Sequence, residues 1–183
     1  MTRDAVLAAA QRQFAELGYD RTSLRSIANE AGVDQKLVAY FFSTKQALFV
    51  AATQLPFNPS AAIPHVLGGD VRGRGERLAR LIVGLLESPE AGPKLIGLVR
   101  AAAAEPEAAR LVRDLFGREI WGPAAAKLPV NDPALAVNQI ATQVLGLAMT
   151  RYVVRAEPLA SMPAHRVIQI LAPTLQRLLA GDT

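Results

Sequence analysis

Two short apolar patterns meet at one glycine within residues 26–45, SIANEAGVDQKLVAYFFSTK, and this corner constrains the fold most strongly. Apolar residues recur at helical spacing over 24–31 and again over 33–42, so each segment predicts a short amphipathic helix. Gly32 permits the tight turn between them, because glycine adopts left-handed backbone angles without a steric penalty. Asp34 is a suitable cap for the second helix. The sequence therefore predicts two helices held at a sharp angle.

The composition favours an all-α protein. Of the 183 residues, 51% are hydrophobic but only 5% are aromatic, and alanine and leucine are abundant. No run of alternating β-branched residues is long enough to suggest a sheet. The chain has no cysteine, which excludes a disulfide scaffold and thiolate-bound metals.

Helical periodicity and breaks predict two domains. The predicted helices, in order, cover residues 3–17, the two segments of the corner, a segment from Ser43 or Thr44 toward Leu55, and then 76–87, 93–104, 107–121, 134–155 and 164–180. Segment 56–75, rich in proline and glycine, is expected to be a linker, with further breaks at Gly122-Pro123 and Asn131-Asp132-Pro133. We predict a three-helix domain over 1–50 and a helical bundle over 51–183.

A helix-glycine-helix corner is typical of helix-turn-helix proteins, whose second helix enters the major groove of DNA. Gln35 and Lys36 begin that helix here, and these side-chain types pair with adenine and guanine edges. Arg25, Tyr40 and Lys45 are expected to reach phosphates. The alternative is an ordinary corner of a helical bundle. Charge does not decide between them, because residues 1–50 carry six basic and five acidic side chains, a net +1.

A longer stretch, from Val6 to Phe49, resembles the DNA-binding domain of the tetracycline-repressor (TetR) family. The resemblance lies in AAAQRQFAELGYDRTSLRSIANEAGV, followed by LVAYFFSTKQALF. The matching positions are Phe14, Ala15, Gly18, Tyr19, Thr22-Ser23, Ile27-Ala28, Ala31-Gly32-Val33, Tyr40-Phe41-Phe42, Lys45 and Leu48. The resemblance implies a transcriptional regulator, expected to be a repressor, that binds a palindromic DNA operator as a homodimer and is released by a small-molecule effector.

Two positions depart from the family pattern. Ala39 stands where the family often has tyrosine, so we expect Tyr40 to take over part of a phosphate contact. Asp34 stands where the family often has serine, and it brings a negative charge close to phosphate. The predicted DNA-binding residues are Thr22, Ser23, Arg25, Gln35, Lys36, Leu37, Ala39, Tyr40 and Lys45.

The segments 134–155 and 164–180 are apolar around most of their circumference. A helix that is apolar on most sides must be covered on most sides. We expect a second copy of the chain to cover them, which would give a homodimer suited to a two-fold operator. Burial of both helices within one monomer is the alternative.

An apolar or aromatic effector is predicted for the C-terminal domain. Trp121 is the only tryptophan, and a pocket of such residues with few polar groups suits ligands of this kind. Arg100 falls on an apolar helical pattern, where it could face an anionic effector or lie on the surface. The predicted ligand-binding residues are Phe57, Arg100, Phe116, Trp121, Met149 and Tyr152.

Other functions have little support in the sequence. His65 and His165 have no partner at ligand spacing, so we predict no metal, and no motif indicates a cofactor or catalytic nucleophile. No segment approaches the roughly 20 apolar residues of a membrane helix, and a cytoplasmic location is expected. The main rival is a dimeric helical ligand-binding protein without specific DNA binding, and an enzyme on a helical bundle is a third option.

Overall fold

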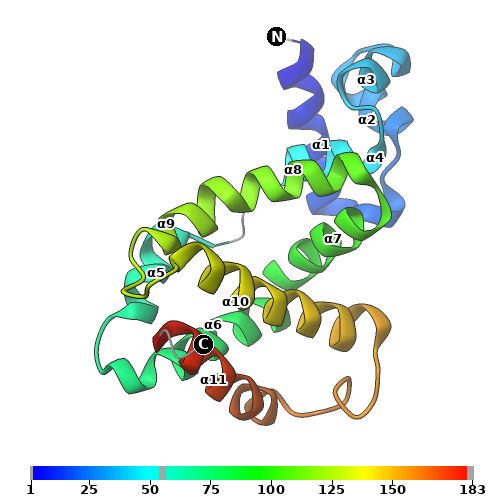
Figure 1. Ribbon diagram of the computed structural model, residues 1–183. Helices are drawn as coiled ribbons and strands as arrows, with labels where there is room; N and C mark the ends of the chain where they lie inside the picture. The colour runs from blue at the N-terminus through cyan, green and yellow to red at the C-terminus, as the bar shows by residue number, and fades with distance from the viewer. Residues whose placement is uncertain (1, 54–56, 181–183) are drawn as a thin grey trace. The chain divides into compact units, whose positions relative to one another are not determined.

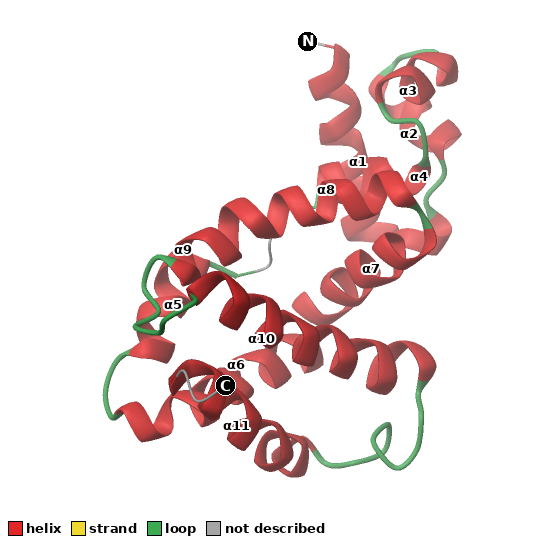
Figure 2. Cartoon of the chain, in the orientation of Figure 1, coloured by secondary structure: helices red, strands yellow, loops and turns green. Residues whose placement is uncertain are grey.

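The computed structural model describes residues 2–53 and 57–180, and this part of the chain is all-α, with no strand (Figure 2). The helices are α1 Thr2–Arg21, α2 Leu24–Ala31, α3 Gln35–Phe41, α4 Lys45–Ala52, α5 Pro59–Leu67, η1 Val71–Gly73, α6 Arg74–Glu87, α7 Ala91–Ala104, α8 Pro106–Phe116, η2 Gly117–Trp121, α9 Gly122–Ala125, α10 Pro133–Leu147, η3 Ala148–Val154 and α11 Ala164–Ala180. Here η1 is a 3₁₀ helix, whereas η2 and η3 are π-helical. None of the described helices is long and apolar enough to cross a membrane.

The chain divides into two compact units. The first combines Met1–Gln54 with Arg100–Arg113, and the second combines Leu55–Val99 with Asp114–Thr183. The sequence predicts a simple boundary near residue 50, whereas the structure adds the end of α7 and most of α8 to the first unit. One reason is local: the Thr44 hydroxyl donates a hydrogen bond of 2.8 Å to the Glu105 carboxylate between α7 and α8.

The first unit is built on α1 to α4 (blue to cyan in Figure 1). Its core takes apolar residues from all four helices and from Phe42, which follows α3. The fully or nearly buried members are Val6, Ala9, Ala10, Ile27, Ala28, Val38, Phe42, Leu48 and Ala52. Alanines on α1 and α2 let these helices approach closely, so four short elements hold one fixed arrangement.

Side-chain caps set where these short helices begin. Ser23 caps α2 in a capping box with Ser26, Asp34 caps α3, and Thr44 caps α4 by accepting from the Ala47 N–H at 3.0 Å. Each cap satisfies backbone donors that the first turn leaves without a partner. At the other end of α1, Gly18 has φ 76°, which breaks the helix as its glycine predicts.

The second unit is organised around α6 and α11, which lie side by side over most of their lengths (Figure 1). The buried stripe of α11, formed by Val167, Leu171, Leu175 and Leu179, is covered inside the monomer. Gly75 of α6 makes a close approach possible, since an added Cβ would lie 2.4 Å from the Ala172 carbonyl oxygen. The packing of α11 against α6 thus buries, within one monomer, much of the apolar surface that the sequence analysis expects a second copy of the chain to cover.

Two sequence expectations about breaks are wrong. Segment 56–75 contains α5 and η1 rather than a plain linker, because Pro59 occupies the first helical position and buried Val66 anchors α5. Pro64 lies inside α5, where it removes only one backbone donor. Gly122-Pro123 is not a break either, since both residues continue helically into α9.

Candidate functional site

The turn between α2 and α3 positions a set of polar side chains. Gly32 has φ 67° and its N–H donates to the carbonyls of Ala28 and Asn29, while the Val33 N–H donates to Ala28 at 3.0 Å. These bonds end α2 and redirect the chain within two residues. Asp34 then starts α3 by accepting from the Lys36 N–H at 2.7 Å. The turn is therefore fixed by backbone hydrogen bonds and not only by packing.

The exposed side of α3 carries most of the predicted DNA-reading residues. Gln35, Lys36 and Ala39 are exposed, and Tyr40 is 81% exposed, an unusual placement for a large aromatic side chain. Leu37 is half-buried on the same helix. Val38 is fully buried and holds α3 on the core, so the neighbouring side chains have a rigid base.

Thr22 and Ser23 occupy structural positions at the start of α2. Thr22 is only 2% exposed, and its hydroxyl is hydrogen-bonded to the carbonyls of Gln13 and Gly18, at 3.2 and 2.8 Å. Ser23 is exposed, but its side chain caps α2. The sequence pattern does not reveal that the Thr22 hydroxyl is turned inward, away from any external partner.

Arg25 and Lys45 lie on different helices of the first unit. Arg25 is exposed on α2. The Lys45 ammonium lies 4.3 Å from the centroid of the Tyr19 ring and donates to the Asp20 carbonyl at 3.5 Å. Burial lowers the pKa of Lys45, against an opposing effect of Asp20. Lys45 thus already has an aromatic partner, which restricts the directions its side chain can take.

A polar network that the sequence does not predict joins α1 to α2. The Glu30 carboxylate accepts from Arg12 and from Gln13, each at 2.7 Å, and the Ser26 hydroxyl donates to the Gln13 side-chain carbonyl at 2.7 Å. Gln13 is 8% exposed, so these bonds satisfy its buried amide. The network fixes the angle between α1 and the helix that carries the turn.

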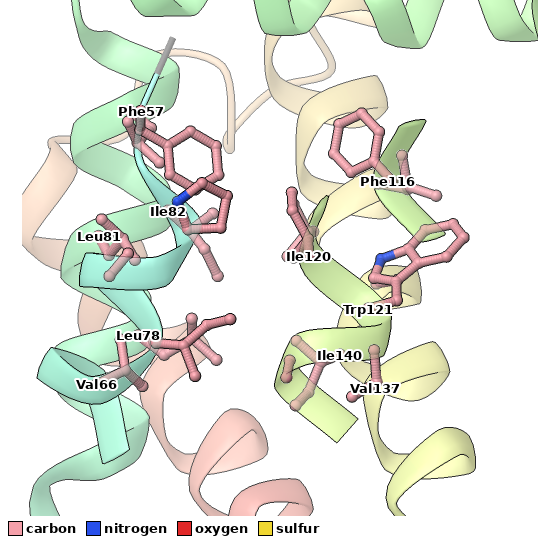
Figure 3. A pocket seen from close by; sticks show the side chains of 18 of the residues that line it. Phe57, Val66, Leu78, Leu81, Ile82, Phe116, Ile120, Trp121, Val137 and Ile140 are labelled. Carbon is pink, nitrogen blue, oxygen red and sulfur yellow. The ribbon is translucent and has the colours of Figure 1, made fainter. Parts of the chain in front are cut away.

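The second unit contains an apolar cavity of about 220 Å³. Figure 3 shows residues of α5 and α6 on one side facing residues of α8, η2 and α10 on the other. The labelled lining residues are Phe57, Val66, Leu78, Leu81, Ile82, Phe116, Ile120, Trp121, Val137 and Ile140. Cavities of this size and character accept small organic molecules.

Three of the six predicted ligand-binding residues line this cavity. Phe57, Phe116 and Trp121 do so, and the last two rings pack with their centroids 6.0 Å apart. Arg100 is exposed and belongs to the first unit, so it does not contribute a charge to the cavity. Met149 and Tyr152 are half-buried on η3 and do not line it either.

Tyr152 has a different set of contacts. Its hydroxyl donates to the Glu87 carboxylate at 3.2 Å, and the same oxygen accepts from the buried Arg151 at 2.8 Å. Burial is the main factor that raises the pKa of Tyr152. Arg151 also donates to the Leu159 carbonyl, which ties the loop before α11 to the end of α6. The side chain of Tyr152 therefore belongs to a structural cluster.

Both π-helical segments border the cavity. Segment η2 supplies Ile120 and Trp121, and η3 supplies Ala148. A π-helical turn shifts the following side chains around the helix axis, and such turns are frequent at functional sites. Both irregular segments therefore contribute side chains to the wall of the cavity.

Comparisons with known proteins agree with both halves of this description. A family model described as "Bacterial regulatory proteins, tetR family" matches residues 6–52, and one described as "Tetracyclin repressor-like, C-terminal domain" matches residues 73–179, more than half of the chain. The chain belongs to the TetR family. It is therefore a DNA-binding transcriptional regulator with a C-terminal ligand-binding domain, and not an enzyme. The predicted family and the all-α fold are both confirmed.

Solved structures with a similar fold match nearly the whole chain. A TetR-family regulator from Streptomyces coelicolor is 38% identical, with 98% of this chain and 94% of that chain covered and a TM-score of 0.61. The multidrug binding protein EbrR, complexed with proflavin, is 21% identical, with 97% of this chain and 99% of that chain covered and a TM-score of 0.63. The structure of EbrR complexed with ethidium is 22% identical, with 97% of this chain and 98% of that chain covered and a TM-score of 0.61. Among curated proteins, no match was found.

Proposed function

We propose that this TetR-family regulator is a repressor that binds a palindromic operator as a homodimer and leaves it when a small molecule fills the cavity of the second unit. The observation that carries the DNA-reading part is the exposed start of α3. Gln35 and Lys36 project from a helix that is capped by Asp34 and anchored by Val38. Side chains at the start of a recognition helix are those that reach base edges.

The DNA contacts that we propose divide into two classes. Gln35 and Lys36 read base edges, whereas Arg25, Tyr40 and Lys45 contact phosphates. The phosphate contacts position the head, by which we mean helices α1 to α4 of the first unit. Leu37 and Ala39 contribute apolar surface beside them. Thr22 and Ser23 act from behind this surface, because their hydroxyls are used in hydrogen bonds that set the start of α2.

Dimerisation through α10, η3 and α11 is supported by the apolar side chains left exposed there. Leu135 and Leu145 of α10 are 49% and 45% exposed, and Ile170 of α11 is 59% exposed. Exposed apolar groups on neighbouring helices favour association with a second copy, and a two-fold pair suits a two-fold operator. We expect the homodimer to act in the cytoplasm, where its operator is accessible.

The effector that we propose is an apolar or aromatic small molecule. The apolar lining of the cavity supports this class. A ligand can release DNA only if it binds the released state more tightly than the DNA-bound state. The coupling therefore requires that filling the cavity is incompatible with the DNA-bound arrangement.

The proposed DNA-binding surface can be tested with Lys36→Ala and a matched control, Lys94→Ala, an exposed lysine on α7. We expect Lys36→Ala to weaken binding to duplex DNA, measured by fluorescence anisotropy over a series of salt concentrations. Loss of one cationic contact lowers the slope of log affinity against log salt by about one. Lys94→Ala should bind like the wild type.

The main rival remains a dimeric ligand-binding protein without specific DNA binding. Asp34 and the small net charge of the first 50 residues motivate it, because both weaken attraction to phosphate. Equal effects of Lys36→Ala and Lys94→Ala on duplex binding would favour this rival. Unaltered binding by both variants would do the same.

A further inference from the structure

The lining of the cavity is unusually uniform in its chemistry. Among the described residues that line it, every side chain is apolar except for the indole N–H of Trp121. No described residue of the wall carries a charge, a hydroxyl or an amide. The wall thus offers a bound molecule dispersion contacts and one hydrogen-bond donor, but no acceptor side chain.

Two arginines that lie close in sequence to wall residues, Arg77 and Arg151, have partners elsewhere. The Arg77 guanidinium donates to the carbonyls of Val66, Gly68 and Asp70 at the end of α5. Arg151 donates to Glu87 and to the Leu159 carbonyl. Neither arginine lines the cavity, and each already has carbonyl or carboxylate partners. An anionic ligand would find no counter-ion in these two arginines without breaking these bonds.

We infer that the cavity selects an uncharged ligand, mainly hydrocarbon, and rejects organic cations and anions of the same shape. This inference rests on the proposed function, because it specifies the ligand of the proposed effector site. The physical reason is desolvation: a charge moved into an apolar site without a counter-ion loses its hydration, and contacts with the rings of Phe57, Phe116 and Trp121 compensate a cation only in part. Among the described side chains of the wall, Trp121 is the one that can donate to an acceptor atom on the ligand.

The volume indicates the size of ligand that the cavity suits. An apolar cavity of about 150 Å³ binds benzene. A cavity of about 220 Å³ is roughly half as large again, which suits two fused rings or a similar compact hydrocarbon. Phe116 and Trp121 both line the cavity, and aromatic contacts with a ligand add to the gain from burial alone.

A matched pair of probes isolates charge from shape: 1-methylnaphthalene is neutral, whereas N-methylquinolinium has nearly the same outline and a permanent positive charge. Binding of each to the full chain, without DNA, is measured by isothermal titration calorimetry and by emission of Trp121, the only tryptophan. We expect the neutral probe to bind at least about a hundredfold more tightly. Equal or tighter binding of the cation would overturn the inference, and so would no binding of either probe.

A second variant pair tests the cause of this selectivity. Ala141 lines the cavity from α10, and Ala141→Asp adds a carboxylate there while Ala141→Asn adds the same shape without charge. At pH 8, Ala141→Asp should lose preference for the neutral probe and gain affinity for the cation, whereas Ala141→Asn should gain none. Equal effects of the two variants would contradict the charge argument. Duplex binding, measured separately, reports on the proposed function whichever way these titrations turn out.

Discussion

Thr22 shows how one side chain can hold the head together from the inside. It is nearly fully buried, and its hydroxyl is bonded to two carbonyls around the break at Gly18. The family pattern contains a threonine here, but the pattern alone does not separate contact with DNA from support of the helix that presents it. The structure favours support, because the hydroxyl has partners within the protein.

Replacing Thr22 by valine keeps the volume and removes the hydroxyl. We expect Thr22→Val to destabilise the first unit by about 1–3 kcal/mol, the usual result of leaving buried polar groups without partners. Hydrogen exchange of the amides of α1 and α2 should show faster opening. Thr142→Val is the control, because Thr142 is exposed in α10 and donates only to the Asn138 carbonyl. Wild-type exchange combined with weaker duplex binding would instead assign Thr22 to the DNA surface.

The lowered pKa of Glu30 predicts how the stability of the head changes as the pH falls. Hydrogen bonds from the Gln13 and Arg12 side chains lower the pKa of Glu30. Because the folded pKa is below the unfolded value of about 4.3, the ionised form stabilises the fold at neutral pH. This contribution is lost as pH falls through the folded pKa. The head should therefore be most sensitive to Glu30 above that range.

We expect Glu30→Gln to reduce stability at pH 7 and to approach the wild type as the pH falls below about 4.3. Hydrogen exchange of α1 and α2 as a function of pH measures the difference, with Glu16→Gln, an exposed glutamate of α1, as the control. A difference between wild type and Glu30→Gln that stays constant from pH 7 to pH 3 would refute the assigned role of the carboxylate.

At the scale of elements, α3 combines a cap that stabilises it with a charge that opposes its proposed partner. Asp34 accepts from the Lys36 N–H, and its carboxylate lies beside the residues proposed to meet DNA. Asparagine caps helices about as well as aspartate. Asp34→Asn therefore separates the two effects.

We expect Asp34→Asn to bind duplex DNA up to about fivefold more tightly at low salt, with the gain disappearing as salt screens the charge. Anisotropy titrations at two salt concentrations measure it. Asp132→Asn is the control, because Asp132 caps α10 in the second unit by accepting from the Leu135 N–H at 3.0 Å. Weaker binding by Asp34→Asn would mean that the carboxylate contributes to the DNA surface.

Elements whose signals are local could be predicted, and those that depend on distant partners could not. Gly32 and the apolar spacing around it define the turn, and the structure places Gly32 at φ 67° as the turn requires. Pro59 and Pro64 suggest a linker, yet buried Val66 stabilises α5 through contacts with residues more than 60 positions away. The π-helical segments also left no recognisable local signal.

The sites follow the same division. The exposed start of α3 is predicted because a short helix after a glycine turn fixes which positions face outward. The Glu30 network is not, because Gln13 and Glu30 are 17 positions apart and either could be an ordinary surface residue. The cavity draws its wall from many elements between α5 and α11. Phe57, Phe116 and Trp121 line it, whereas Arg100, Met149 and Tyr152 lie outside its lining.

At the scale of the whole molecule, the proposal joins a DNA-reading head to a ligand cavity through a homodimer. The apolar stripe of α11 is largely used inside the monomer, so the dimer must rely on the exposed remainder, including Leu135, Leu145 and Ile170. Two heads related by a two-fold axis should read two inverted half-sites. The symmetry of the preferred DNA therefore reports on the head and on the dimer together.

The most direct test is selection of bound duplexes from a random pool, with purified full-length chain at one near-physiological salt concentration. The account predicts enrichment of an inverted repeat, with two half-sites at a fixed spacing. Repeating the selection with Gln35→Ala should relax preference at one base position in each half-site. Salt-sensitive binding without any enriched sequence would contradict the account and leave a dimeric ligand-binding protein as the better description.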